Sequence, residues 1–325
     1  MKKLFIAAIA VIITAIMVFS LASCSVLKPL PKNETLGEAL RNGGYELEWE
    51  DDFEGDSIDA TRWRVGLNDP LRRAGYYVKD LAFVEDSNLI IRTEYRENGE
   101  YGKGWYTSWV ESGITRGHTS ASLGSEEYKG YATKYGYFEA RCKAPKASGI
   151  WSAFWMMPEE GVGMTDKDEL NTGRDGVEID IMESPFYGSK EKNQVIHVVH
   201  GDGYGDNLKS DRSAAYRVPK MYDEYHTYGV MWTEDEYIFF IDGRETYRTK
   251  YVVDGKELGV SSVSEYLLLT VEIAGENDGN GNLFVGKQKD GKGGYEPHWA
   301  GDPEDNDKSK QYDFAVDYVR VYKKK

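Results

Sequence analysis

Short runs of alternating apolar and polar residues recur along most of the chain. They are rich in Val, Ile, Tyr and Phe, and turn-forming pairs such as Asn98-Gly99 and Asp242-Gly243 separate them. Alternation with a period of two is typical of a strand that buries one face, and such pairs favour tight turns. The pattern predicts strands over residues 45–49, 89–95, 137–143, 237–241, 266–273 and 314–322. Few helical patterns lie between them, so we expect an all-β fold.

The most informative segment is 178–183, where three carboxylates stand within six residues. In an extended strand, Glu178 and Asp180 share one face, and the isoleucines that alternate with them point to the other face. Glu183 has the wrong parity for the first face unless one extra residue is inserted. A β-bulge at Met182 would correct the parity, because a bulge sets two residues of one strand opposite one residue of its partner. We therefore expect all three carboxylates on one face of a bulged strand.

Three acids on one face suit the hydrolysis of a glycosidic bond. Hydrolysis with retention uses two carboxyl groups about 5 to 5.5 Å apart, one to attack the anomeric carbon and one to protonate the leaving oxygen. Glu178 and Glu183 are the candidates for these two roles. The charge of Asp180 between them would raise the proton affinity of Glu183, and its oxygen would hold Glu178 in position. The alternative is a solvated acidic face, which the alternating isoleucines and the parity of Glu183 disfavour.

Together with its neighbours, this segment resembles the catalytic signature of glycoside hydrolase family 16, in the longer, bulged form. The supporting motifs occur in order at residues 135–141, 149–158, 226–233, 240–243 and 316–322. The likeness runs from about Tyr45 to Tyr322. It implies a jelly-roll sandwich of two curved antiparallel sheets, of the concanavalin A-like type, with a concave substrate cleft.

The resemblance also implies roles for individual residues. Glu178 corresponds to the nucleophile, Asp180 to the assisting carboxylate and Glu183 to the general acid/base, and no cofactor is required. A structural calcium ion on the convex side is compatible with the resemblance, and Asp317 is then a candidate ligand.

A histidine facing the cleft is a further feature of laminarinase-like members of that family. His197 stands where the resemblance places this residue, although a single histidine on a strand is as often structural. His200 follows three residues later. On a regular strand the two rings lie on opposite faces, so we do not expect them to share a metal ion.

Tryptophans are the candidate sugar platforms, because an aromatic ring can cover the apolar face of a sugar. Trp151 and Trp155 are four residues apart and share a face of a regular strand, which the resemblance places beside the catalytic strand. Trp105 and Trp109 repeat this spacing, and Trp299 lies in a glycine-rich loop that could overhang the cleft. Core packing is the alternative for each of them.

The first 24 residues predict export. Two lysines precede an apolar run over residues 4–22, and small residues stand directly before Cys24. This arrangement resembles a bacterial lipoprotein signal, in which Cys24 would be lipidated and become the first mature residue. The protein would then be anchored to the cell envelope or cell surface. A transmembrane anchor is the alternative, because the apolar run is just long enough to span a bilayer.

The remainder of the chain divides into two parts. Residues 25–44 contain prolines, glycines and polar residues and predict a tether, and residues 45–325 form the catalytic domain. With lipid on Cys24, Cys142 is left without a partner, so we expect no intrachain disulfide.

The formal net charge of −15 disfavours nucleic acids and other polyanions as partners. It favours a neutral β-linked polysaccharide as substrate, although a local basic patch in the cleft could override the global sign. We expect the protein to be a monomer.

The substrate itself is less sharply defined. The bulged signature and residues 150–158 are most like endo-β-1,3-glucanases, which predicts activity on laminarin or mixed-linkage glucans. After Trp63, however, residues 68–73 depart from the laminarinase-like pattern. Three alternatives therefore stay open: an endo-β-galactosidase of the agarase-like or host O-glycan-cleaving kind, a transglycosylase, and a non-catalytic surface glycan-binding lipoprotein.

Overall fold

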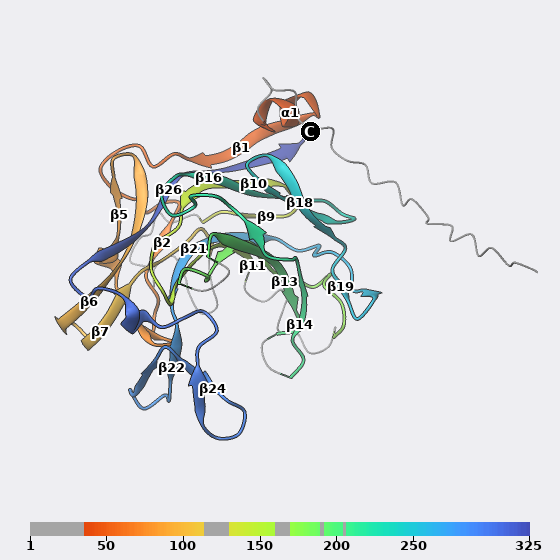
Figure 1. The fold of residues 1–325 in the computed structure, drawn as a ribbon. Coiled ribbons are helices and arrows are strands. Elements are labelled where there is room, and N and C mark those ends of the chain that lie inside the picture. Colours follow the sequence, from red (N-terminus) through yellow and green to blue (C-terminus); the bar gives the residue numbers. More distant parts are fainter. Residues whose placement is uncertain (1–35, 114–129, 160–169, 189–191, 204–205) are drawn as a thin grey trace, which may run out of the picture.

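The protein is described here by a computed structural model, which covers residues 36–113, 130–159, 170–188, 192–203 and 206–325. Within these ranges the chain is nearly all β-structure, and every strand that the alternation predicts is present. Two large sheets form two layers of a sandwich (Figure 1). The expected all-β, two-sheet architecture is confirmed.

The first layer is an eleven-stranded sheet, counted over the described residues. Across the sheet the order is β18 (Arg244–Thr249), β17 (Tyr237–Ile241), β16 (His226–Trp232), β10 (Gly136–Lys143), β26 (Gln311–Lys324), β6 (Asn88–Gly99), β7 (Gly102–Thr107), β4 (Gly75–Tyr77) and β3 (Leu71–Arg72). Two further strands join it at its side: β1 (Tyr45–Asp51) pairs with β26, and β5 (Ala82–Glu85) pairs with β6. Neighbouring strands are antiparallel except for β4 and β7, which are parallel.

The second layer is a nine-stranded sheet over the same described residues. Its order is β14 (Lys209–Arg212), β13 (Gln194–Gly201), β12 (Glu178–Ser184), β11 (Ile150–Pro158), β21 (Glu265–Ile273), β8 (Trp109–Glu111) and β2 (Arg64–Val65). At its side, β15 (Tyr216–Arg217) pairs with β13 and β9 (Ala132–Thr133) pairs with β21. The strand that carries the three acids, β12, therefore lies inside this sheet.

Small elements lie between the strands of the two sheets. In the described part of the chain they are the two-stranded pairs β19 (Val252–Val253) with β20 (Lys256–Glu257), β22 (Gly275–Asn277) with β23 (Leu283–Val285), and β24 (Lys287–Lys289) with β25 (Tyr295–Pro297), and 3-10 turns at Lys79–Leu81 and Pro303–Asp305. The β22–β23 and β24–β25 pairs extend away from the sandwich on the side of the nine-stranded sheet (Figure 1).

The main hydrophobic core lies between the two sheets. From β12 it takes Ile179, Ile181 and Met182, and from β10 it takes Phe138 and Ala140, all fully buried. Burying apolar area of this kind contributes roughly 25 cal/mol per Å², so the inward face of each strand fixes its orientation. Because one face of β12 is held in the core, its other face is left to the site.

The predicted tether over residues 25–44 is wrong in its last part. Leu36–Asn42 form a short helix, α1, that lies over the outer face of the eleven-stranded sheet. Leu36 and Leu40 are four residues apart, so they share one side of the helix and pack against Tyr137 and Phe240. The folded body therefore begins before Tyr45.

Residues 1–35 lie outside the described part of the chain, and with them the leader and Cys24. Lipidation and export therefore stay predictions. Among the described residues, no helix is long and apolar enough to cross a membrane. Cys142 is a free, buried thiol whose pKa is raised by burial.

Candidate active site

The bulge in β12 is present, and it lies one residue from where the parity argument put it. On the side of β11, Trp155 pairs with Asp180 and the residue before Trp155 pairs with Met182, so Ile181 is the extra residue. On the side of β13, the register shifts between Asp180 and Glu183. The predicted bulge is thus confirmed, and the predicted position at Met182 is corrected to Ile181.

Because of the bulge, the three carboxylates of β12 lie on one face of the sheet. Ile181 and Met182 are consecutive, yet both are fully buried in the core between the sheets. Glu178, Asp180 and Glu183 all line one cavity on the opposite face of the sheet and are at most 8% exposed. Three carboxyl groups are therefore held close together with little access to water.

Two neighbouring cavities lie in the cleft among the described residues. The cavity at the carboxylates has a volume of about 60 Å³, and the cavity beside it has a volume of about 410 Å³. The smaller is lined by Arg72, Arg73, Trp151, Ala153, Trp155, Glu178, Asp180, Glu183, Thr270 and Glu272. The larger is lined by Arg64, Leu67, Asn68, Asp69, Leu71, Arg72, Trp109, Glu111, Trp155, Met157, Tyr266 and Leu268. Because Arg72 and Trp155 belong to both, the two cavities are parts of one groove.

The electrostatics of the cavity favour a protonated Glu183. Burial, and then the charge of Glu178, raise the pKa of Glu183 to about 8. A hydrogen bond of 3.1 Å from Trp151 Nε1 to Glu183 Oε1 acts in the opposite direction and lowers this pKa. The pKa of Asp180 is raised well above its ordinary value, by burial and then by Glu183 and Glu178. We expected the charge of Asp180 to raise the proton affinity of Glu183, whereas burial and Glu178 are the causes in the structure. At neutral pH Glu183 is thus a proton donor.

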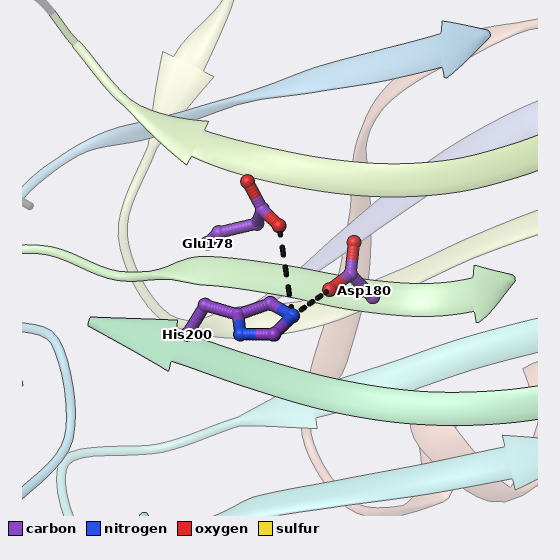
Figure 2. A group of neighbouring side chains, drawn as sticks. All are labelled: Glu178, Asp180 and His200. Carbon is purple, nitrogen blue, oxygen red and sulfur yellow. Dashed lines mark ion pairs between the residues drawn. The ribbon is translucent and has the colours of Figure 1, made fainter. Parts of the chain in front are cut away.

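The histidine in the site is His200 and not His197. His197 is fully buried, its Nδ1 lies 2.7 Å from the carbonyl oxygen of Ile181, and its ring stacks on Phe239. The prediction that His197 faces the cleft is therefore wrong, while the prediction that the two rings point to opposite faces is confirmed. Figure 2 shows His200 reaching from β13 toward Glu178 and Asp180 on β12.

Sequence reasoning missed His200 because it lacked the register of the strands. His200 pairs with Glu178, and residues that stand opposite each other in a sheet share a face. Burial, and then the charge of Arg212, lowers the pKa of His200 to about 4, so its ring is neutral at neutral pH.

The four candidate tryptophans divide between cleft and core. Trp151 and Trp155 both line the carboxylate cavity, which confirms that they share a face, and Trp109 lines the larger cavity. Trp105 is 0% exposed in the core, where its Nε1 donates to Glu304 over 2.9 Å, so its prediction as a substrate-binding residue is wrong. The equal spacing failed here because the chain passes from the first sheet to the second between Trp105 and Trp109.

Trp299 lies at the margin of the site. It is 50% exposed, and its ring centroid lies 4.8 Å from that of Trp151. The glycine-rich loop therefore does carry an aromatic ring to the cleft.

Two arginines in the cleft escaped the sequence analysis. Arg72 and Arg73 lie in the segment 68–73, and both bind Glu272, with N–O distances of 2.7 and 3.0 Å. The guanidinium of Arg73 lies 4.9 Å from the ring centroid of Trp151, a cation–π contact. Burial would raise the pKa of Glu272, but the two arginines outweigh this and lower it. The signal in the sequence was Glu272, a glutamate among the mostly apolar residues of β21, and the sequence did not indicate its partners.

Asp317, the candidate calcium ligand, is engaged in an ion pair. One of its oxygens accepts a charge-assisted bond from Arg141. A guanidinium beside the carboxylate opposes a second cation at that oxygen. The structural calcium stays a prediction.

The comparisons with known proteins agree with this geometry. The profile of glycosyl hydrolases family 16 matches residues 102–257, which include all three carboxylates. A beta-glucanase of Rhodothermus marinus is 27% identical over 217 residues, which are 63% of this chain and 65% of that protein. Beta-porphyranase B of Zobellia galactanivorans is 28% identical over 207 residues, 60% of this chain and 64% of that protein. The chain thus spans slightly less than two thirds of the length of these relatives.

The fold has solved counterparts as well. The laminarinase catalytic domain of Thermotoga maritima superposes with a TM-score of 0.59 at 24% identity, covering 86% of this chain and 98% of that one. This similarity shows a shared fold. Within this fold, residues 102–257 match glycosyl hydrolases family 16, and the bulged carboxylate strand lies inside the matched range.

Proposed function

We propose that this protein is a retaining endo-glycosidase that hydrolyses internal β-linkages of a neutral polysaccharide. We propose that the substrate is a β-1,3- or mixed-linkage glucan and that no cofactor takes part. The observation that carries the proposal is the convergence of Glu178, Asp180 and Glu183 on one cavity that Trp151 and Trp155 also line. The match of residues 102–257 to glycosyl hydrolases family 16 supports the same reaction class.

The proposed reaction has two steps. In the first, a carboxylate oxygen of Glu178 attacks the anomeric carbon while Glu183 gives its proton to the departing oxygen, which leaves a covalent glycosyl-enzyme. In the second, Glu183 takes a proton from a water molecule whose oxygen attacks the anomeric carbon and releases Glu178. Because the pKa of Glu183 is raised to about 8, its carboxyl group is protonated at neutral pH and can give the proton that the first step consumes. Asp180 lies between the two glutamates in the sequence of β12, and burial and the charges of Glu183 and Glu178 raise its pKa.

Two features favour an endo-acting glucanase. The groove continues from the carboxylates into the larger cavity, where Trp109 and Trp155 present aromatic rings to a further sugar unit. The Rhodothermus marinus relative is named a beta-glucanase, and the Thermotoga maritima domain is named a laminarinase.

An endo-β-galactosidase is the second candidate. Arg72 and Arg73 line the carboxylate cavity, in the segment that departs from the laminarinase-like pattern. They provide the local positive charge that could override the net charge of −15. A relative named beta-porphyranase supports keeping galactans in the test.

A substrate panel tests the proposal. Laminarin, lichenan, agarose, porphyran, carrageenan and mucin O-glycans are incubated with the protein, and products are sized by mass spectrometry. We expect oligosaccharides of several lengths from laminarin or lichenan, with the β-anomer formed first in NMR spectra. Cleavage of porphyran or agarose alone would favour the second candidate, and products longer than the donor would indicate a transglycosylase. No cleavage of any β-glycan would refute the enzyme and leave a glycan-binding protein.

We propose in addition that the chain is exported and acts as a monomer anchored by lipid on Cys24. The apolar run and the small residues before Cys24 support this. A bacterium that expresses the full chain with an alkyne-labelled fatty acid should label the wild type and not Cys24→Ala. Equal labelling of both forms would contradict the anchor.

A further inference from the structure

Three side chains on β12 and β13 point toward one another: Glu178, Asp180 and His200 (Figure 2). His200 Nε2 lies 3.6 Å from Asp180 Oδ2 and 3.9 Å from Glu178 Oε1, both too long for a hydrogen bond (Figure 2). One nitrogen and two carboxylate oxygens therefore surround a common point. All three atoms lie within 4.8 Å of one another.

The two spacings from His200 Nε2 suit a small divalent ion. Zinc binds imidazole nitrogen and carboxylate oxygen at about 2.0 to 2.2 Å in tetrahedral geometry, which sets neighbouring ligand atoms about 3.3 to 3.6 Å apart. The observed separations from His200 Nε2 are within a few tenths of an ångström of that range. An imidazole among the ligands selects zinc-class ions over calcium and magnesium, which prefer oxygen alone.

Two further observations point to a ligand at this position. Asp180 is only 3% exposed, and its Oδ2, the oxygen nearest His200, has no hydrogen-bond partner. Leaving a buried carboxyl oxygen without a partner costs free energy that a bound ion would recover. The other ring nitrogen of His200, Nδ1, lies 2.6 Å from Ser210 Oγ, which holds the ring with Nε2 toward the acids. A histidine oriented through its second nitrogen is the usual arrangement in metal sites.

We propose that Glu178, Asp180 and His200 form a binding site for one divalent transition-metal ion of the zinc class, and that the ion and the polysaccharide exclude each other. Three protein ligands leave a fourth position for water. Because the ion takes up the oxygen of Glu178, that oxygen is no longer available to attack the anomeric carbon. The exclusion rests on the proposed function of Glu178, whereas the binding does not.

The charge of Arg212 should weaken the affinity of this site for the ion. Arg212 lies on β14, in register with Val198, which in turn pairs with Asp180, so it reaches the same face as the acids. Its positive charge lowers the pKa of His200 and Asp180, and it opposes a second cation in the same way. Arg212→Gln should therefore bind the ion more tightly than the wild type.

Calorimetric titration of the full chain with zinc chloride, without substrate, tests the binding. The wild type should bind one ion at the site. His200→Gln and Asp180→Asn should each weaken this binding at least about a hundredfold, because each removes a ligand. Ser210→Ala should weaken it about tenfold, because the ring of His200 loses its hydrogen-bond partner. His226→Gln is the matched control, because His226 pairs with Asp242 on the other sheet at 2.8 Å, and it should bind as the wild type does. Equal zinc affinity in the wild type, His200→Gln and Ser210→Ala would overturn the site, as would the absence of binding by a folded wild type.

Turnover tests the exclusion separately. With a substrate found by the panel, zinc should inhibit the wild type competitively, and substrate at saturating concentration should restore the rate. Arg212→Gln should be inhibited at lower zinc concentration. Inhibition that substrate does not relieve would overturn the exclusion while leaving the binding result intact. If the panel yields no substrate, the proposed function fails and the titration still decides the metal site.

Discussion

The nine-stranded sheet buries two carboxylates, Glu272 and Glu183, that line the same cavity, and their pKa values are shifted in opposite directions. Glu272 on β21 faces Arg72 and Arg73, and its pKa is lowered in spite of burial. Glu183 on β12 is equally enclosed, and burial and then the charge of Glu178 raise its pKa to about 8, although Arg212 and Arg73 act in the opposite direction.

The difference shows why one buried carboxylate in this fold stays ionised while another keeps its proton. A buried carboxylate beside two guanidinium groups stays ionised and holds a loop against the sheet. A buried carboxylate for which burial and a neighbouring acid outweigh the nearby arginines keeps its proton near neutral pH. The sheet supplies the burial in both places, and the neighbouring side chains decide its consequence.

Replacing an acid from each place gives the largest contrast. Glu178→Gln and Glu183→Gln should each lower kcat about a thousandfold or more, because each removes a group that reacts with the substrate. Glu272→Gln should lower kcat by less than about tenfold, yet it should destabilise the fold by about 2 kcal/mol, because two arginines lose their partner. Steady-state kinetics and urea unfolding measure the two effects. Near-normal activity in a folded Glu178→Gln or Glu183→Gln would break the comparison.

Glu265 extends the comparison to an acid outside the cleft. It is buried at the end of β21, its Oε1 accepts the N–H of Val177 over 3.3 Å, and burial raises its pKa from 4.5 to about 8. Between these values the folded state holds a proton that the unfolded state has lost, so this group makes stability fall as pH rises through this range. Relative to Glu265→Gln, the wild type should lose about 2 kcal/mol or more between pH 5 and pH 8. Parallel stability curves for the two proteins in urea would contradict the raised pKa.

The indole of Trp151 provides the smallest expected effect. Its bond to Glu183 lowers the pKa of that group, so Trp151→Phe should move the basic limb of the kcat/KM profile about half a unit to higher pH. Trp155→Phe is the control, because its indole donates to Thr270 and not to an acid. A basic limb that stays in place in Trp151→Phe, or that moves equally in both variants, would argue against Glu183 as the titrating group.

Local pattern was enough to predict most of the strands and the gathering of the three acids on one face. Strand alternation located β6, β10, β17 and β26, because a half-buried strand needs apolar residues at every second position. The parity of Glu183 required a bulge, and the structure contains one. These features depend on residues close together in the sequence.

The predictions that depended on contacts between distant parts of the sequence were wrong, or were not made at all. The choice between His197 and His200 required the register of β13 against β12, and the burial of Trp105 required knowing that its strand belongs to the other sheet. Arg72 and Arg73 reach Glu272 from two hundred residues away along the chain.

The sequence by itself therefore determined the strands, the bulge and the three acids, since backbone geometry and hydrophobic period act over a few residues. Tertiary structure alone decided which histidine meets the acids, which tryptophans line the cleft and which carboxylates keep a proton. Each of those outcomes is set by pairing between strands and by desolvation, and both arise only when remote segments are brought together.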